Sequence, residues 1–281
     1  MKLLVLGHGY SAGYLTPLLC AKGWQVTGTT RTDPARVQAA GARALRWPGD
    51  EGQIRRAITE TDAILISAAP GPSGDPALAE FADDIACSPA RWIGYLSTTG
   101  VYGDRQGDWV DEDATLTPST ARGRERVAAE AEWQALARSH DLPLHIFRLA
   151  GIYGPGRGPF AKLRAGTARR ILKPGQVFSR IHVVDIAQVL EASIQKPDPG
   201  RIYNLCDDDP APPEDIIAYA AELAGLPIPP AEDFAQAEMT PMARSFYAES
   251  KRVRNDRIKR ELGVTLRYPD YRSGLQAMAG D

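Results

Sequence analysis

A glycine-rich segment close to the N-terminus has a spacing that suits phosphate binding. It lies between an apolar run that predicts a strand and leucines at helical spacing that predict a helix. The pattern G-x-G-x-x-G/A is formed here by Gly7, His8, Gly9, Tyr10, Ser11 and Ala12. The two glycines would permit a tight turn and a close approach of the backbone to a pyrophosphate, and the alanine would let the helix pack closely. The helix amides would receive the phosphate charge, so the segment predicts a dinucleotide site.

The end of the second predicted strand distinguishes two dinucleotides. An acidic side chain there would accept a hydrogen bond from the ribose 2′-hydroxyl of NAD, whereas an arginine suits the 2′-phosphate of NADP. The sequence has Thr30 and Arg31 at this point, and a guanidinium makes charge-assisted contacts with phosphate. Asp33 is a competing candidate for a ribose contact, but we expect it to cap the following helix. The sequence therefore predicts NADP as the cofactor, in preference to NAD.

Short apolar runs alternate with helical patterns along most of the chain. The predicted strands cover residues 2–6, 24–29, 42–47, 63–67, 91–96, 144–148 and 202–205. The predicted helices lie near residues 33–40, 51–59, 76–85, 121–139 and 214–224. This alternation predicts an α/β fold with a doubly wound parallel sheet. Ligands bind at the carboxyl ends of such strands, so we add Ala68, Ala69 and Ser97 to the cofactor site.

Clusters of glycine and proline beyond residue 151 indicate a second, smaller domain. We assign residues 1–152, with residues 177–205 returning to them, to a dinucleotide-binding domain. Residues 153–176 and 206–281 then form a small C-terminal substrate domain.

Four further segments carry short motifs in a fixed order. They are L-S-T-T-G-V-Y-G-D at 96–104, R-L-A-G-I-Y-G-P-G at 148–156, I-H-V-V-D at 181–185 and Y-N-L at 203–205. Together they resemble the extended short-chain dehydrogenase/reductase superfamily, to which the NAD-dependent epimerases and dehydratases belong. The resemblance implies a Rossmann fold that binds NAD or NADP. It also places Thr98 where that family has its catalytic serine or threonine.

The same family has a Tyr-x-x-x-Lys pair on the long helix, where the tyrosine is the acid or base and the lysine lowers its pKa. Counting back from Glu130, this chain has Arg122 and Arg126 at those positions. A guanidinium does not release its proton in a protein, and no tyrosine lies between Tyr102 and Tyr153. The resemblance therefore implies an atypical member of the superfamily that lacks this pair.

Other side chains must then supply the chemistry. Thr98, Tyr153 and His182 are the catalytic candidates, because the fold would bring their segments toward the cofactor. The alternative for Tyr153, as for Tyr102, is a packing role, and the alternative for His182 is a structural hydrogen bond.

Arginines are the candidates for substrate binding. Arg122 and Arg126 lie four residues apart and share one helix face, and with Arg180 they would favour an anionic ligand. The alternative is that they form solvated ion pairs with neighbours such as Glu125 and Glu130.

Two functions agree with these observations. The first is an NADP-dependent oxidoreductase or epimerase-like enzyme of altered mechanism, acting on a small anionic or sugar-like molecule. The second is a catalytically inactive module that senses NADP(H) and acts through a partner, which the missing pair would permit.

The composition argues against several other classes. The 281 residues carry a formal net charge of −2, so we expect no nucleic-acid partner. No apolar run is long enough for a signal peptide or a membrane span, which predicts a cytoplasmic protein without a membrane partner. The 4 histidines lack paired spacing and predict no metal site.

We interpret the acidic run 111–113 and the basic stretch 252–260 as solvated surface. The family resemblance implies a homodimer formed through helix 121–139.

Overall fold

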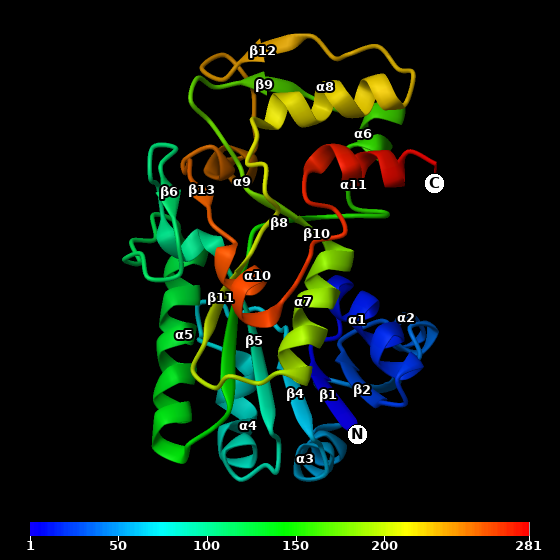
Figure 1. The fold of residues 1–281 in the computed structure, drawn as a ribbon, viewed down its shortest axis with the longest axis vertical. Helices are drawn as coiled ribbons and strands as arrows, with labels where there is room; N and C mark the ends of the chain where they lie inside the picture. The colour runs from blue at the N-terminus through cyan, green and yellow to red at the C-terminus, as the bar shows by residue number, and fades with distance from the viewer. Residues whose placement is uncertain (281) are drawn as a thin grey trace.

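A parallel sheet of seven strands forms the centre of the molecule (Figure 1). The computed structural model describes residues 1–280, apart from the side chains of residues 241 and 242. The strand order is β11-β7-β5-β4-β1-β2-β3, and every neighbouring pair is parallel. The strands are β1 (Lys2–Leu6), β2 (Gln25–Thr30), β3 (Arg43–Arg46), β4 (Ala63–Ile66), β5 (Trp92–Thr98), β7 (Leu144–Leu149) and β11 (Ile202–Leu205). The predicted doubly wound fold is confirmed.

Helices cover both faces of this sheet, and its central strands are therefore apolar on both sides. Every residue of β4 and of β7 is buried. One face packs against α1 (Tyr10–Ala21), α2 (Pro34–Ala39), α7 (Val183–Gln195) and α10 (Asp256–Leu262). The other face packs against α3 (Glu51–Thr59), α4 (Pro76–Ala86) and α5 (Ala121–His140). Because every neighbouring pair of strands is parallel, the carboxyl ends of all seven strands lie along one edge of the sheet.

A smaller layer of elements lies above that edge (Figure 1). Its helices α6 (Phe160–Arg164), α8 (Pro213–Leu223) and α11 (Tyr271–Met278) share an apolar cluster of their own. The remaining elements are η1 (Thr99–Tyr102), α9 (Pro241–Phe246) and the strand pairs β6 (Trp109–Val110) with β13 (Arg252–Val253), β8 (Gly151–Tyr153) with β10 (Arg180–His182), and β9 (Arg170–Leu172) with β12 (Ala231–Asp233). The C-terminal segment then returns to the sheet, where Ile258, Val264 and Leu266 are part of the core beside α7.

The I-H-V-V-D segment explains how this return is held in place. The sequence did not predict α7, which begins directly after β10. His182 Nδ1 accepts a hydrogen bond from the Val184 amide and caps the helix. The Asp185 carboxylate accepts from the amides of Arg267 and Tyr268, at 2.6 and 3.1 Å. The motif therefore fastens the C-terminal segment to the first turn of α7.

A buried ion pair lies at the carboxyl end of the sheet. Arg148 Nη2 on β7 is 2.8 Å from Glu130 Oε2 on α5, and each side chain is 3% exposed. The Ser97 hydroxyl on β5 donates to the same carboxylate. Arg148 Nη1 also donates to the Tyr102 hydroxyl, which in turn donates to Asn204 Oδ1 on β11. The strand register places Ser97, Arg148 and Asn204 opposite one another on the adjacent strands β5, β7 and β11. One row of polar groups therefore crosses the sheet.

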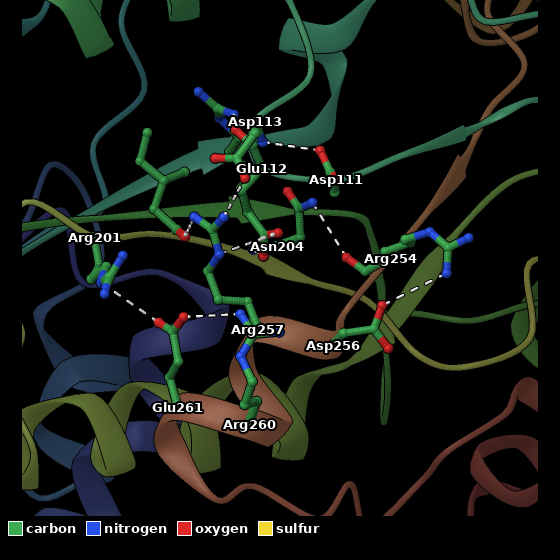
Figure 2. Close-up of polar contacts among 12 residues, drawn as sticks. Asp111, Glu112, Asp113, Arg201, Asn204, Arg254, Asp256, Arg257, Arg260 and Glu261 are labelled. Atoms are coloured by element: carbon green, nitrogen blue, oxygen red, sulfur yellow. Dashed lines mark hydrogen bonds and ion pairs between the residues drawn. The ribbon is translucent and has the colours of Figure 1, made fainter.

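One residue of the acidic loop extends this row, so the interpretation of residues 111–113 as solvated surface is wrong at Glu112, whereas Asp111 and Asp113 are exposed. Glu112 is buried, and its carboxylate accepts from the Asn204 amide on the edge strand at 2.9 Å. Arg257 on α10 points toward this loop, 3.6 Å from Glu112 Oε2 and 2.8 Å from Asp113 Oδ2 (Figure 2). The prediction for the basic stretch was therefore also wrong at Arg257. Asn204 lies on an edge strand, so its amide would otherwise lack a hydrogen-bond partner, and the Glu112 carboxylate supplies one.

Replacing Glu130 by glutamine should destabilise the protein strongly. The variant leaves the Arg148 guanidinium buried without a counter-charge, which costs about 3–5 kcal/mol. Urea denaturation should measure this loss as a lower midpoint with an unchanged slope. Glu60→Gln is the control, because its ion pair with Lys2 is about half exposed and should matter far less. Equal midpoints for the two variants would contradict a structural role for the buried pair.

Candidate functional site

A cavity of about 740 Å³ opens at the carboxyl ends of β1, β2 and β4. Seven of the predicted cofactor residues line it: Gly7, His8, Gly9, Thr30, Arg31, Ala68 and Ala69. Its other lining residues were not predicted from the sequence, among them Arg36, Trp47, Pro48, Ser67 and Ser73. Tyr10, Ser11, Ala12 and Ser97 do not line it. Tyr10 donates its hydroxyl to the Pro155 carbonyl, and Ser97 donates to Glu130.

Two glycines shape the turn beneath this cavity. Gly7 has a φ of +90°, and a Cβ atom there would lie 2.6 Å from the Ala68 amide nitrogen. Gly28 leaves room for the His8 ring, since a Cβ atom would lie 2.6 Å from its Cδ2. His8 Nε2 is 2.8 Å from Thr16 Oγ1, and burial lowers the pKa of this histidine. His8 therefore supports the turn as a neutral ring.

The first turn of α1 offers the amides that a pyrophosphate needs. The Gly13 amide bonds to the Gly9 carbonyl at 3.0 Å, so the amides of Tyr10, Ser11 and Ala12 have no carbonyl to bond within the helix. No side chain caps the helix, and its first turn contains no acidic residue. This end of the helix therefore fits a pyrophosphate.

The far end of the cavity is basic. Arg31 is exposed there beside the buried Thr30, and Arg36 Nη2 donates to the His8 carbonyl at 3.2 Å. The Asp33 carboxylate accepts from the Arg36 amide at 3.0 Å, which confirms the predicted helix cap. Asp33 does not line the cavity, and the carboxylate that does, that of Glu80, lies 3.8 Å from Arg55. One guanidinium group thus follows the second strand directly and another comes from α2, while Asp33 between them caps that helix.

A second cavity of about 380 Å³ lies above β5 and β7. Of the predicted site residues, Thr98, Arg122, Tyr153 and Arg180 line it. The lining residues that the sequence analysis missed include Val177, Phe178, Phe246, Glu249 and Lys251. The two cavities share no lining residue. They open above adjacent strands of one sheet edge, because β4 and β5 are neighbours.

The predicted catalytic side chains are held by different contacts. Thr98 is partly exposed to the second cavity, and its Oγ1 accepts from the Gly100 amide at 3.1 Å. The Tyr153 hydroxyl donates to the Asp270 carbonyl at 3.3 Å, and burial raises the pKa of this tyrosine. His182 packs between Tyr153 and Tyr268, outside the lining, and burial lowers its pKa to about 4.

The two arginines of α5 do not point to the same place. Arg122 lines the second cavity, and its guanidinium lies 5.0 Å from the centre of the Phe246 ring. Arg126 does not line it and donates to the Tyr95 hydroxyl and the Leu96 carbonyl. The first arginine is therefore available to a ligand, whereas the second is bound to β5.

No sequence pattern predicts Lys251 and Glu249 as site residues, and they are notable in the sequence only because they lie next to the basic stretch 252–260. Their side chains form a largely buried ion pair of 2.7 Å, and Lys251 Nζ also donates to the Gly103 carbonyl at 2.7 Å. Only the folding of this segment onto residues 103–107 brings the pair to the cavity. Within residues 1–280, no group of three acidic, histidine or cysteine side chains could hold a metal ion, and no helix could cross a membrane.

Replacing Gly7 by alanine should weaken dinucleotide binding at least tenfold, because the added carbon would push against the Ala68 backbone. Calorimetric titration with NADP(H) measures this effect. Gly13→Ala is the matched control, since a Cβ atom there meets nothing within 4 Å and alanine suits a helix interior. Unchanged affinity in Gly7→Ala would refute the assignment of this turn.

Replacing His182 by asparagine should make stability less sensitive to acid, because asparagine retains a capping acceptor but does not titrate. The histidine pKa is lowered from 6.5 to about 4 in the fold, so only the unfolded chain takes up this proton as the pH falls below 6.5. Urea denaturation at pH 7 and pH 5 should show that the wild type loses about 1 kcal/mol more than the variant, after allowance for solvent screening. Equal losses would mean that the imidazole titrates normally in the fold.

The comparisons with known proteins agree with this geometry. Residues 78–206 match the model of the NAD dependent epimerase/dehydratase family. The chain is 31% identical over 288 residues to Protein YeeZ of Escherichia coli (strain K12), covering 96% of this chain and 97% of that protein.

Two solved structures extend the comparison. A functionally unknown conserved protein from Silicibacter pomeroyi DSS is 59% identical, with a TM-score of 0.95 over 99% of this chain and 98% of that chain. The UDP-glucuronic acid 4-epimerase from Bacillus cereus, solved in complex with NAD, is 16% identical, with a TM-score of 0.79 over 100% and 98% of the two chains. The epimerase shows the shared fold alone, whereas the identity to the Escherichia coli protein extends over nearly the whole chain. The protein therefore belongs to the NAD-dependent epimerase/dehydratase family.

Proposed function

We propose that this protein is an NADP(H)-dependent oxidoreductase or epimerase-like enzyme of the cytoplasm, acting on a small anionic or sugar-like molecule. The observation that carries the proposal is the basic end of the cofactor cavity. Arg31 and Arg36 both line it, while Asp33 is used as the cap of α2. A 2′-phosphate would meet two guanidinium groups there, and a free ribose would find no acid from the second strand.

The residues present fit such a dinucleotide along its whole length. The amides at the start of α1 would hold the pyrophosphate, and the close turn at Gly7 gives the backbone access to it. The nicotinamide end would reach the second cavity, because Thr98 ends the strand next to β4. When bound, the dinucleotide would supply hydride transfer.

The chain's own residues would then bind and orient the substrate. Thr98 offers a hydroxyl at the floor of the second cavity, and Arg122 and Arg180 offer guanidinium groups on its walls. Lys251 and Glu249 also line it, and unlike arginine these side chains can exchange protons. We therefore assign the altered mechanism to proton transfer within this lining.

A second function is favoured by one observation. Arg126, at the position where the family's lysine is expected, is bound to the backbone and a side chain of β5 and does not reach the cavity. A protein that binds NADP(H) without turning it over, and that reports through a partner, would need no acid or base there. Both functions require cofactor binding, and only the first requires turnover.

Replacing Arg31 by alanine should weaken NADP(H) binding about 10- to 100-fold and leave NAD(H) binding nearly unchanged. The variant removes a charge-assisted contact with the 2′-phosphate, worth about 1.5–3 kcal/mol. Calorimetric titrations with both dinucleotides measure the difference, and Arg36→Ala should behave in the same direction. Arg91→Ala is the control, because Arg91 is exposed and lies outside this cavity.

The wild type provides the decisive comparison. Tighter binding of NAD(H) than of NADP(H) would overturn the cofactor assignment while leaving the family function intact. Failure to bind either dinucleotide would overturn the proposed function as a whole.

A further inference from the structure

The second cavity is walled by aromatic and aliphatic side chains. Ile152, Tyr153, Val177, Phe178 and Phe246 all contribute to its lining. Its volume of about 380 Å³ is near the lower end for ligand sites. The nicotinamide ring would share this space, because Thr98 lies in the same lining. The room left suits a compact and largely apolar molecule.

Each arginine of this lining is stacked on a phenylalanine of the same lining. The Arg122 guanidinium lies 5.0 Å from the centre of the Phe246 ring, and that of Arg180 lies 5.9 Å from the centre of the Phe178 ring. Arg180 Nη1 also donates to the carbonyls of Phe178 and Ala211, which fixes its orientation. Stacking holds a guanidinium by its face and leaves its edge free to donate hydrogen bonds.

The three cations of this lining differ in their acidic neighbours. Lys251 is neutralised by Glu249 at 2.7 Å. Asp207 interacts electrostatically with Arg180, although no hydrogen bond joins them. Arg122 has a hydrogen bond of 3.5 Å to Ser245 but no ion pair with any carboxylate of the described residues. Arg122 is exposed to solvent, so its charge is available to an anion from solution.

From these observations we infer that the substrate is a compact aromatic carboxylate, with its carboxylate at Arg122 and its ring between the walls formed by Phe178 and Phe246. This inference rests on the proposed function, since it names the substrate class of the same site. A nucleotide-linked sugar carries a diphosphate and a second ring system, whereas this lining offers a single cation without an acidic partner among the described residues. A matched neutral amide would keep the ring contacts and lose the ion pair.

The test is a calorimetric titration of the full-length protein with trans-cinnamate, trans-cinnamamide, benzoate, cyclohexanecarboxylate and UDP-glucose. Each titration is run with and without saturating NADP⁺, because the nicotinamide ring would occupy part of the second cavity. Cinnamate should bind about tenfold or more tightly than cinnamamide, as expected for a charge-assisted contact. Benzoate should bind more tightly than cyclohexanecarboxylate, because the aromatic ring stacks better on phenylalanine.

Variants locate the contact. Arg122→Gln should remove the preference for cinnamate over cinnamamide, whereas Arg124→Gln should keep it. Arg124 is the matched control because it lies on the same helix, is exposed and does not line the cavity. Phe246→Leu should weaken benzoate binding more than cyclohexanecarboxylate binding. Unchanged thermal unfolding of each variant would show that the fold is intact.

The possible results separate this inference from the proposed function. Equal affinity for acid and amide, or tighter binding of UDP-glucose than of cinnamate, would overturn the inference even if NADP(H) binds. A preference for cinnamate that depends on Arg122 would support it even if neither dinucleotide binds, and the proposed function would then fail alone.

Discussion

The buried ion pair between Glu130 and Arg148 is the interaction on which the upper edge of the sheet depends. It joins α5 to β7, and its further hydrogen bonds reach Ser97 on β5 and Tyr102 on η1. Through Tyr102 and Asn204 the same row extends to the edge strand. Because a buried charge must keep its partner, these elements cannot shift independently of one another. Thr98 follows Ser97 directly, so the floor of the second cavity is positioned by this row.

Both cavities are electropositive, but the positive charge comes from different groups in each. The cofactor cavity combines backbone amides at the start of α1 with the side chains of Arg31 and Arg36. The second cavity uses side chains alone, and Arg122 is its cation without a described acidic partner. Amides carry no net charge and suit a pyrophosphate that the backbone approaches closely, whereas stacked guanidinium groups suit a small planar anion. The protein is nevertheless close to neutral as a whole, with a formal net charge of −2.

The arginines of α5 illustrate how two similar residues acquire different surroundings. Arg122 lies in the first turn of the helix, where the chain of α9 faces it and the Phe246 ring supports it. Arg126 lies one turn further along, over β5, and its donors are taken by the Tyr95 hydroxyl and the Leu96 carbonyl. A family pair built for proton transfer needs both positions to face the cofactor. In this chain only the first position faces a cavity.

The sequence by itself determined the fold class and the turn that begins the cofactor site. Periodicity and the spacing of Gly7, Gly9 and Ala12 are local properties, and strand, turn and helix follow one another directly in the chain. The cap at Asp33 could be predicted for the same reason, since it bonds to an amide only three residues away. The tertiary structure alone decided which distant groups complete each site. Lys251 reaches the Gly103 carbonyl across 148 residues of chain, and Arg257 reaches Asp113 across 144. No local pattern encodes such contacts, because they depend on how the C-terminal segment packs back onto the sheet.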